Sequence, residues 1–132
     1  MSAIASRSTD PAADSAPGSP HSALHRGAVV VDMTMPWGDY AQRAELKPGT
    51  LDRLIDSGYT MVSLTIAQDR TPFAEAMASL AKERRFFLER PDRFVLVDTA
   101  ADIERAKAAG KLAVAFHFQG CNPLEGKLEN VA

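Results

Sequence analysis

Apolar and polar positions alternate in blocks along the middle of the chain. Short apolar runs rich in β-branched residues occupy 28–33, 59–66, 94–97 and 111–118. Runs that are apolar at every position are typical of strands buried on both faces of a parallel sheet. We therefore predict a parallel sheet in which each strand is followed by a helix.

The segments between these runs carry helix signals. The first helix is predicted to be capped by Thr50 and to end at Gly58, with Leu51, Leu54 and Ile55 on its inner face. The last helix is predicted to be capped by Thr99 and to end at Gly110.

The second helix is the longest. It is expected to begin at Pro72 and to end before Pro91. The mixed-sign run 82–85 is predicted to form its solvated face. Large apolar residues recur at helical spacing and predict a buried stripe of Phe73, Met77, Leu80, Phe87 and Leu88.

The order β-α-β-α-β-α-β is compatible with an open doubly wound sheet or with part of a closed barrel. A dinucleotide-binding sheet would favour a Gly-x-Gly-x-x-Gly turn after its first strand, and the turn 34–38 lacks it. A complete barrel needs about 250 residues, whereas this chain has 132. The predicted fold is therefore α/β, the N-terminal half of a TIM-type (β/α)8 barrel with outer helices, truncated at its C-terminus.

The first 25 residues differ in composition from the rest of the chain. Residues 1–25 consist mostly of small and polar residues and are predicted to be a disordered extension. Residues 26–132 are expected to hold the partial barrel of about four strands.

Composition and charge exclude several classes of protein. The net charge of −2 argues against a basic nucleic-acid-binding surface. The single cysteine excludes an internal disulfide and a multi-cysteine zinc site. No apolar run approaches the roughly 20 residues that cross a bilayer, so we expect a cytoplasmic protein that binds neither nucleic acid nor membrane.

The segment after the last strand carries the most specific motif. It reads Gln119-Gly120 and then Leu124-Glu125-Gly126-Lys127-Leu128. Together with the strand-loop-helix run 94–110, this segment resembles the membrane (renal) dipeptidase family of metallopeptidases. The resemblance extends more loosely back to Val29.

The resemblance implies an amidohydrolase-type barrel and a metallodipeptidase activity on small peptide or amide substrates. In that family a glutamate bridges two zinc ions, and a metal-activated water attacks the amide bond. A zinc-bound water has a pKa of about 7, so hydroxide is available at neutral pH. A homodimer of the parent protein is compatible with this view.

The family's metal-ligand positions fall on other residues here. Asp32 matches the leading aspartate of the family's first ligand segment. Thr34 stands in place of the ligand histidine, Pro36 in place of the ligand aspartate, and Gln119 in place of the bridging glutamate. These residue types do not hold two zinc ions in the familiar way.

Strand alternation suggests a relocated site. His117 and Gln119 share one face of the last strand, and Asp32 shares the parity of Thr34 on the first strand. Asp32 and His117 are therefore predicted to face each other inside the barrel, either as a relocated metal or acid/base site or as a hydrogen-bonded core pair.

Three further residues are predicted to lie near the mouth of the barrel. Trp37 and Tyr40 follow the first strand and either bind substrate or cover the mouth. Cys121 has no identifiable base and is expected to be a plain thiol.

The functional alternatives belong to different classes. The parent protein is either a dipeptidase-like hydrolase or a non-catalytic pseudoenzyme that binds ligands on the same barrel. The isolated chain of 132 residues is expected to be an inactive fragment. Because it exposes unpaired strand edges, it is also expected to be poorly soluble or oligomeric, which its elution volume would test.

Overall fold

The computed structural model describes residues 20–37 and 47–131. Its helices are α2 (Pro20–Gly27), α4 (Lys47–Asp56), α5 (Phe73–Leu88) and α6 (Ala100–Ala108). Its strands are β1 (Val31–Pro36), β2 (Met61–Ala67), β3 (Phe94–Leu96) and β4 (Leu112–Phe118). Two short 3-10 turns, η1 (Asn122–Leu124) and η2 (Leu128–Asn130), follow β4. No helix in these ranges has the length and apolar character that crossing a membrane requires.

The described strands form one parallel sheet in the order β1-β2-β4-β3. In a regular barrel, strands that follow one another in the chain are neighbours. Here β3 instead lies outside β4, at the edge of the described sheet. Its three residues pair only with the first half of β4, Leu112 to Val114. Within the described ranges, the second half of β4 has no neighbour on that side.

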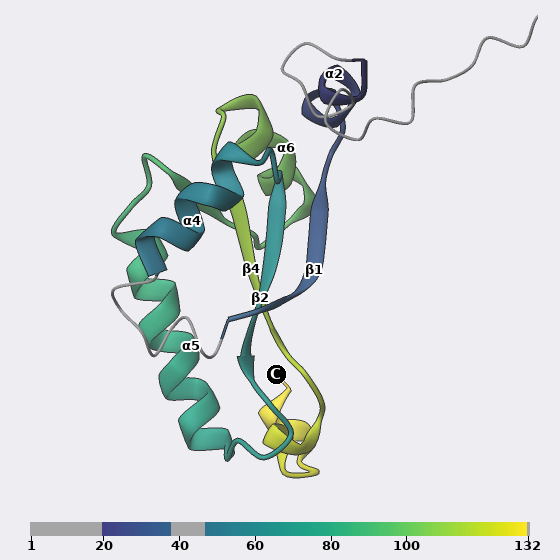
Figure 1. Cartoon of the computed structure of the whole chain (residues 1–132). Coiled ribbons are helices and arrows are strands. Elements are labelled where there is room, and N and C mark those ends of the chain that lie inside the picture. Colours follow the sequence, from purple (N-terminus) through teal and green to yellow (C-terminus); the bar gives the residue numbers. More distant parts are fainter. Residues whose placement is uncertain (1–19, 38–46, 132) are drawn as a thin grey trace, which may run out of the picture.

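Helices α4 and α5 cover one face of the sheet (Figure 1). Alternate strand residues on that face, including Val62, Leu64 and Val114, are completely buried in the main core. Phe87 of α5 lies at its centre, with its ring centroid 5.0 Å from that of Phe94 and the two planes nearly perpendicular. This aromatic contact joins the end of α5 to β3.

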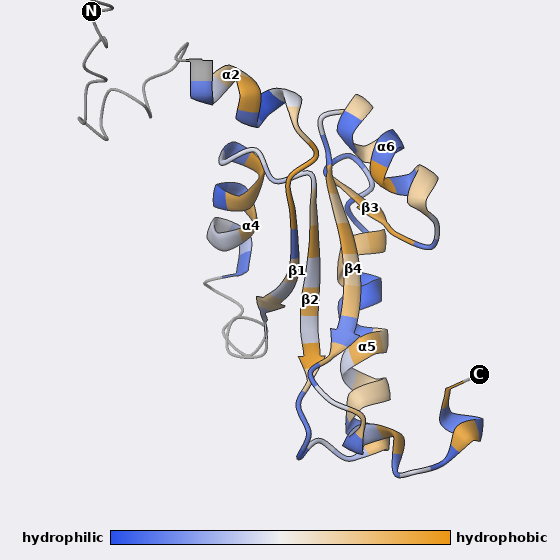
Figure 2. Cartoon of the chain, turned by 90° about the vertical axis from the view of Figure 1, so that its right-hand side faces the viewer, coloured by the Kyte–Doolittle hydropathy of each residue, from blue (hydrophilic) through white to orange (hydrophobic). Residues whose placement is uncertain are grey.

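The opposite face is covered only in part. Helix α6 buries Ala106 against Met61 and Ala113, which form a smaller cluster near the amino ends of the strands. Figure 2 looks onto this face, with β1, β2 and β4 in front of α5 and with polar colouring toward the carboxyl end of β4. This polar part of the sheet is where the sequence predicted functional groups.

A capping interaction fixes the start of α6. The backbone N–H groups of Asp98 and Thr99 donate to Asp102 Oδ2, at 2.9 and 2.8 Å. These two bonds stabilise the carboxylate and hold the pKa of Asp102 below its ordinary value. Thr99 thus caps this helix, as its position in the sequence predicted.

Three boundaries differ from the sequence prediction. The first strand was expected at 28–33 as a buried strand, but β1 runs from Val31 to Pro36 and is mostly exposed at the edge of the described sheet. Residues 20–25 were assigned to a disordered extension, but they belong to α2, whose His25 Nε2 lies 2.7 Å from the carbonyl oxygen of Ser57. Residues 1–19 lie outside the described ranges. Thr50 was predicted to cap a helix, but α4 already begins at Lys47 and buries Thr50.

Candidate functional site

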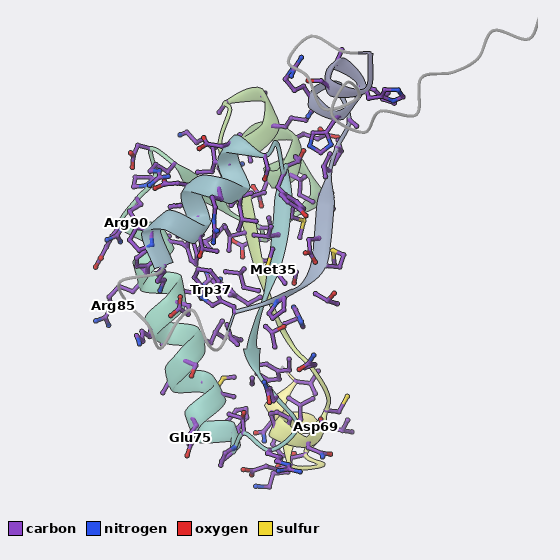
Figure 3. All side chains as sticks on the ribbon, viewed as in Figure 1. Met35, Trp37, Asp69, Glu75, Arg85 and Arg90 are labelled. Atoms are coloured by element: carbon purple, nitrogen blue, oxygen red, sulfur yellow. The ribbon has the colours of Figure 1, made fainter. Side chains whose placement is uncertain are left out.

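A cavity of about 430 Å³ opens at the carboxyl ends of the strands. Ligands of parallel α/β proteins bind at this edge of the sheet. Residues from the ends of β1, β2 and β4 and from the first half of α5 line the cavity. They are Pro36, Trp37, Thr65, Ile66, Ala67, Gln68, Thr71, Glu75, Ser79 and Gln119. Trp37 lies between β1 and α5, and Glu75 lies further toward the start of α5 (Figure 3).

Two of the family's metal-ligand positions meet at this cavity. Pro36 and Gln119 both line it, although they come from β1 and from the end of β4. Thr34, at the third position, is exposed, and its N–H donates to Asp32 Oδ1 at 2.9 Å. Two of the three positions that the resemblance singled out thus lie at one cavity, and neither carries a side chain that ligates zinc.

The donor set does not fit a zinc pair. Proline has no side-chain donor atom, and a neutral carboxamide does not balance two divalent cations. Across residues 20–37 and 47–131, no group of three or more His, Cys, Asp or Glu side chains is placed to hold a metal ion. The zinc chemistry that the resemblance implies is thus not supplied by this part of the chain.

The predicted Asp32–His117 pair is not formed. The β1–β2 register places Asp32 beside Val62, whereas His117 lies beside Thr65. Val62 belongs to the core under α4 and α5, so Asp32 and His117 are on different faces of the sheet. The prediction failed because the register shifts between Asp32 and Met35, which breaks simple alternation along β1.

His117 instead lies between two hydroxyl groups of β2. Its Nδ1 is 2.9 Å from Ser63 Oγ, and its Nε2 is 2.8 Å from Thr65 Oγ1. A neutral imidazole has one donor and one acceptor nitrogen, so both are used by these contacts. His117 therefore connects β4 to β2 and has no free nitrogen for a metal ion.

We expect His117→Ala to lower the free energy of unfolding by about 1–3 kcal/mol, because it leaves two buried hydroxyl groups without partners. Ser63 is only 2% exposed and Thr65 only 5%. Urea denaturation measures the loss. His25→Ala is the matched control, because its ring contact is at the exposed surface, and a change there is expected to stay within about 0.5 kcal/mol. Equal effects of the two substitutions would contradict the bridging role of His117.

Trp37 is part of the core as well as of the cavity. Its side chain is completely buried, and its Nε1 donates to Glu83 Oε2 at 3.0 Å. Trp37 therefore lines the cavity while its side chain is buried in the core, and its binding of substrate stays a prediction. Tyr40, the other residue predicted to bind substrate, lies outside the described residues.

The carboxylate that accepts from Trp37 also forms a buried ion pair. Lys47 Nζ lies 2.6 Å from Glu83 Oε2 and 3.7 Å from the ring centre of Phe86. Burial lowers the pKa of Lys47, and the hydrogen bond that Lys47 donates to Glu83 opposes this effect. The prediction that residues 82–85 form a solvated face was therefore wrong for Glu83.

The loop after β2 contacts the segment after β4. A side chain at Gly120 would overlap the carboxylate of Asp69, because a Cβ there would lie only 2.5 Å from Asp69 Cγ. A larger residue at this position would therefore require the Asp69 carboxylate to move. Cys121 follows as an exposed free thiol, and no base contacts it within the described ranges.

Comparison with known proteins identifies a similar fold among solved structures. No family model and no curated protein matches this chain. Among solved structures, an amidohydrolase from Pseudomonas aeruginosa matches 83% of this chain with a TM-score of 0.68 and 20% sequence identity. The present chain spans only 31% of the length of that protein. The likeness confirms the predicted α/β fold, a parallel sheet with outer helices.

Proposed function

We propose that this chain is part of an amidohydrolase-type hydrolase that cleaves small amides such as dipeptides at the cavity of the sheet. The observation that carries the proposal is the convergence of Pro36 and Gln119 on that cavity. The dipeptidase resemblance assigns both positions to the catalytic centre, and the structure brings them to one place. The amidohydrolase that shares this fold supports the same class of reaction.

The described residues suit the binding of an amide better than the binding of metals. The carboxamides of Gln68 and Gln119 can each donate to a carbonyl oxygen and accept from an N–H group. Ser79 and Thr71 add hydroxyl groups to the same lining. In this proposal these residues bind and orient the amide of the substrate, whereas zinc, if the natural protein holds it, is bound by other parts of the protein.

A second candidate is a binding protein without catalysis. The replacement of ligand residues by Thr34, Pro36 and Gln119 favours it, because those replacements remove metal donors and leave the cavity intact. The two candidates share a ligand class and differ in turnover.

The test uses the natural full-length protein and an L-alanyl-L-alanine substrate, with alanine release followed by mass spectrometry. We expect hydrolysis, and we expect Gln119→Ala to raise KM about fivefold because one hydrogen bond to the amide is worth about 1 kcal/mol. The matched control is Asn122→Ala, since Asn122 does not line the cavity. Binding without hydrolysis would support the binding protein, and the absence of both would refute both candidates.

A further inference from the structure

We propose that Glu75 is the residue of this cavity that binds the amino group of the ligand. The inference rests on the proposed function and adds to it the charge of the ligand. It assigns the site to compounds that carry a free ammonium group close to an amide.

The first argument is the charge of the cavity. Among the described lining residues, Glu75 carries the only formal charge at neutral pH. The other polar groups of the lining are hydroxyls and carboxamides, which are neutral. The described lining therefore has a charge of −1, which favours a cationic group over an anionic one.

The second argument is that the carboxylate of Glu75 is unengaged. Within residues 20–37 and 47–131, Glu75 forms no hydrogen bond and no ion pair. The acidic side chain of Asp69 lies beside Gly120 and is not part of the lining, and Glu83, on the same helix as Glu75, is paired with Lys47. A ligand ammonium at Glu75 would thus meet a carboxylate with both oxygens able to accept.

The third argument is the geometry of the lining. Glu75 and Ser79 are one turn apart on α5, so both side chains face the cavity from the same side of the helix. Gln119, which directly follows β4, lines the same cavity. In this proposal the amide binds at Gln119 and its neighbouring amino group binds at Glu75, on the α5 side of the cavity.

The replaced ligand positions strengthen this argument. Where the resemblance places cations held by acidic residues, this cavity has Pro36 and Gln119, and neither is charged. The carboxylate of Glu75 is the only acidic group of the described lining and is too little to hold a zinc pair, so it is available to the ligand. The ammonium group would supply the positive charge at this place.

The experiment compares two ligands that differ only in the amino group, L-alanyl-L-alanine amide and its N-acetyl derivative. Calorimetric titration of the full-length protein is expected to show about fivefold tighter binding of the free amine, the effect of one partly exposed ion pair of about 1 kcal/mol. Glu75→Gln should abolish this preference and leave the affinity for the acetylated compound unchanged. Raising the salt concentration should weaken the preference of the wild type.

A matched control distinguishes the loss of ligand binding from a loss of helix stability. An acidic residue in the first turn of a helix stabilises it, so Glu75→Gln is expected to lower stability slightly whether or not it binds ligand. Glu104→Gln on α6 changes the same charge away from the cavity and should retain the fivefold preference. If the wild type binds both compounds equally, or if Glu75→Gln keeps the preference, the role of Glu75 is refuted and the proposed function stands. If neither compound binds and no dipeptide is hydrolysed, the proposed function fails and this inference fails with it.

Discussion

Replacing Phe87 with alanine is expected to lower the free energy of unfolding by about 3–5 kcal/mol, the usual loss when a large aromatic side chain leaves a filled core. Phe87 is 1% exposed and contacts two neighbouring rings edge-on, those of Phe86 at 5.1 Å and Phe94 at 5.0 Å between centroids. The rings of Trp37 and Phe116 lie at 6.4 and 6.0 Å. The truncated side chain would therefore leave a cavity where α5, β3 and β4 meet.

The adjacent residue provides the control for this prediction. Leu88 is on the same helix and was assigned to the same buried stripe, but it is 61% exposed. Leu88→Ala is therefore expected to change stability by no more than about 0.5 kcal/mol. Urea denaturation followed by the fluorescence of Trp37, the single tryptophan of the chain, measures both variants. A loss at Leu88 as large as that at Phe87 would show that α5 is rotated relative to the sheet.

The apolar pattern predicted the strands and their parallel direction well. The runs 59–66 and 111–118 became β2 and β4, whose residues are buried or half-buried. The run 28–33 corresponds to β1, which begins three residues later and is mostly exposed, because it lies at the edge of the described sheet. The position of β3 could not be read from its sequence. Which neighbour a strand of three residues pairs with depends on the partner's exposed edge, and a pattern of polarity does not encode that edge.

Local irregularity limits what side-chain counting can predict. The alternation of side chains assigned Asp32 to the face of His117, and the register shift after Asp32 reversed that assignment. By contrast, Glu83 could have been found from the sequence. It lies three residues after Leu80 and four before Phe87, which places it on the buried side of α5. A charged residue is normally predicted to face solvent. The partner that allows Glu83 to be buried, Lys47, is 36 positions earlier in the chain on another helix, and the sequence does not show that the two meet.

At the candidate site, the sequence identified some of the residues that line the cavity but not its charged residue. The dipeptidase resemblance identified positions Pro36 and Gln119, and both line the cavity. Glu75 was not identified, because it lies on a helix whose sequence signal is amphipathic and carries no motif. Residues that line a cavity from different elements share no spacing in the chain, so only the folded structure brings them together.

The second large effect is expected at the buried ion pair of Lys47 and Glu83. Glu83→Ala should lower the free energy of unfolding by about 3–5 kcal/mol, because it leaves a buried ammonium group without its counter-ion. The side chains are only 7% and 3% exposed, so water does not replace the lost contact. The substitution also removes the acceptor of the Trp37 N–H group. Glu89→Ala, which breaks an ion pair at the surface, is the control and should cost at most about 1 kcal/mol.

The pH dependence of this variant distinguishes a buried charge from lost packing. The pKa of Lys47 is already lowered by burial, and loss of Glu83 removes the interaction that raises it. Between the lowered pKa of the folded state and the ordinary value of 10.5, the unfolded chain binds more protons than the folded one. Stability therefore rises with pH in that window, and Glu83→Ala should recover part of its loss under alkaline conditions.

A double substitution completes the argument about the ion pair. Lys47→Met keeps an unbranched side chain against Phe86, and Glu83→Gln keeps an acceptor for Trp37 Nε1. Because the buried charges disappear together, the double variant is expected to lie within about 1 kcal/mol of the wild type. One oxygen of Glu83, Oε1, is buried without a hydrogen-bond partner, so the wild-type carboxylate already carries a desolvation cost, which is smaller for a neutral carboxamide. A double variant as unstable as Glu83→Ala alone would show that the volume of the two side chains, and not their charge, stabilises this part of the core.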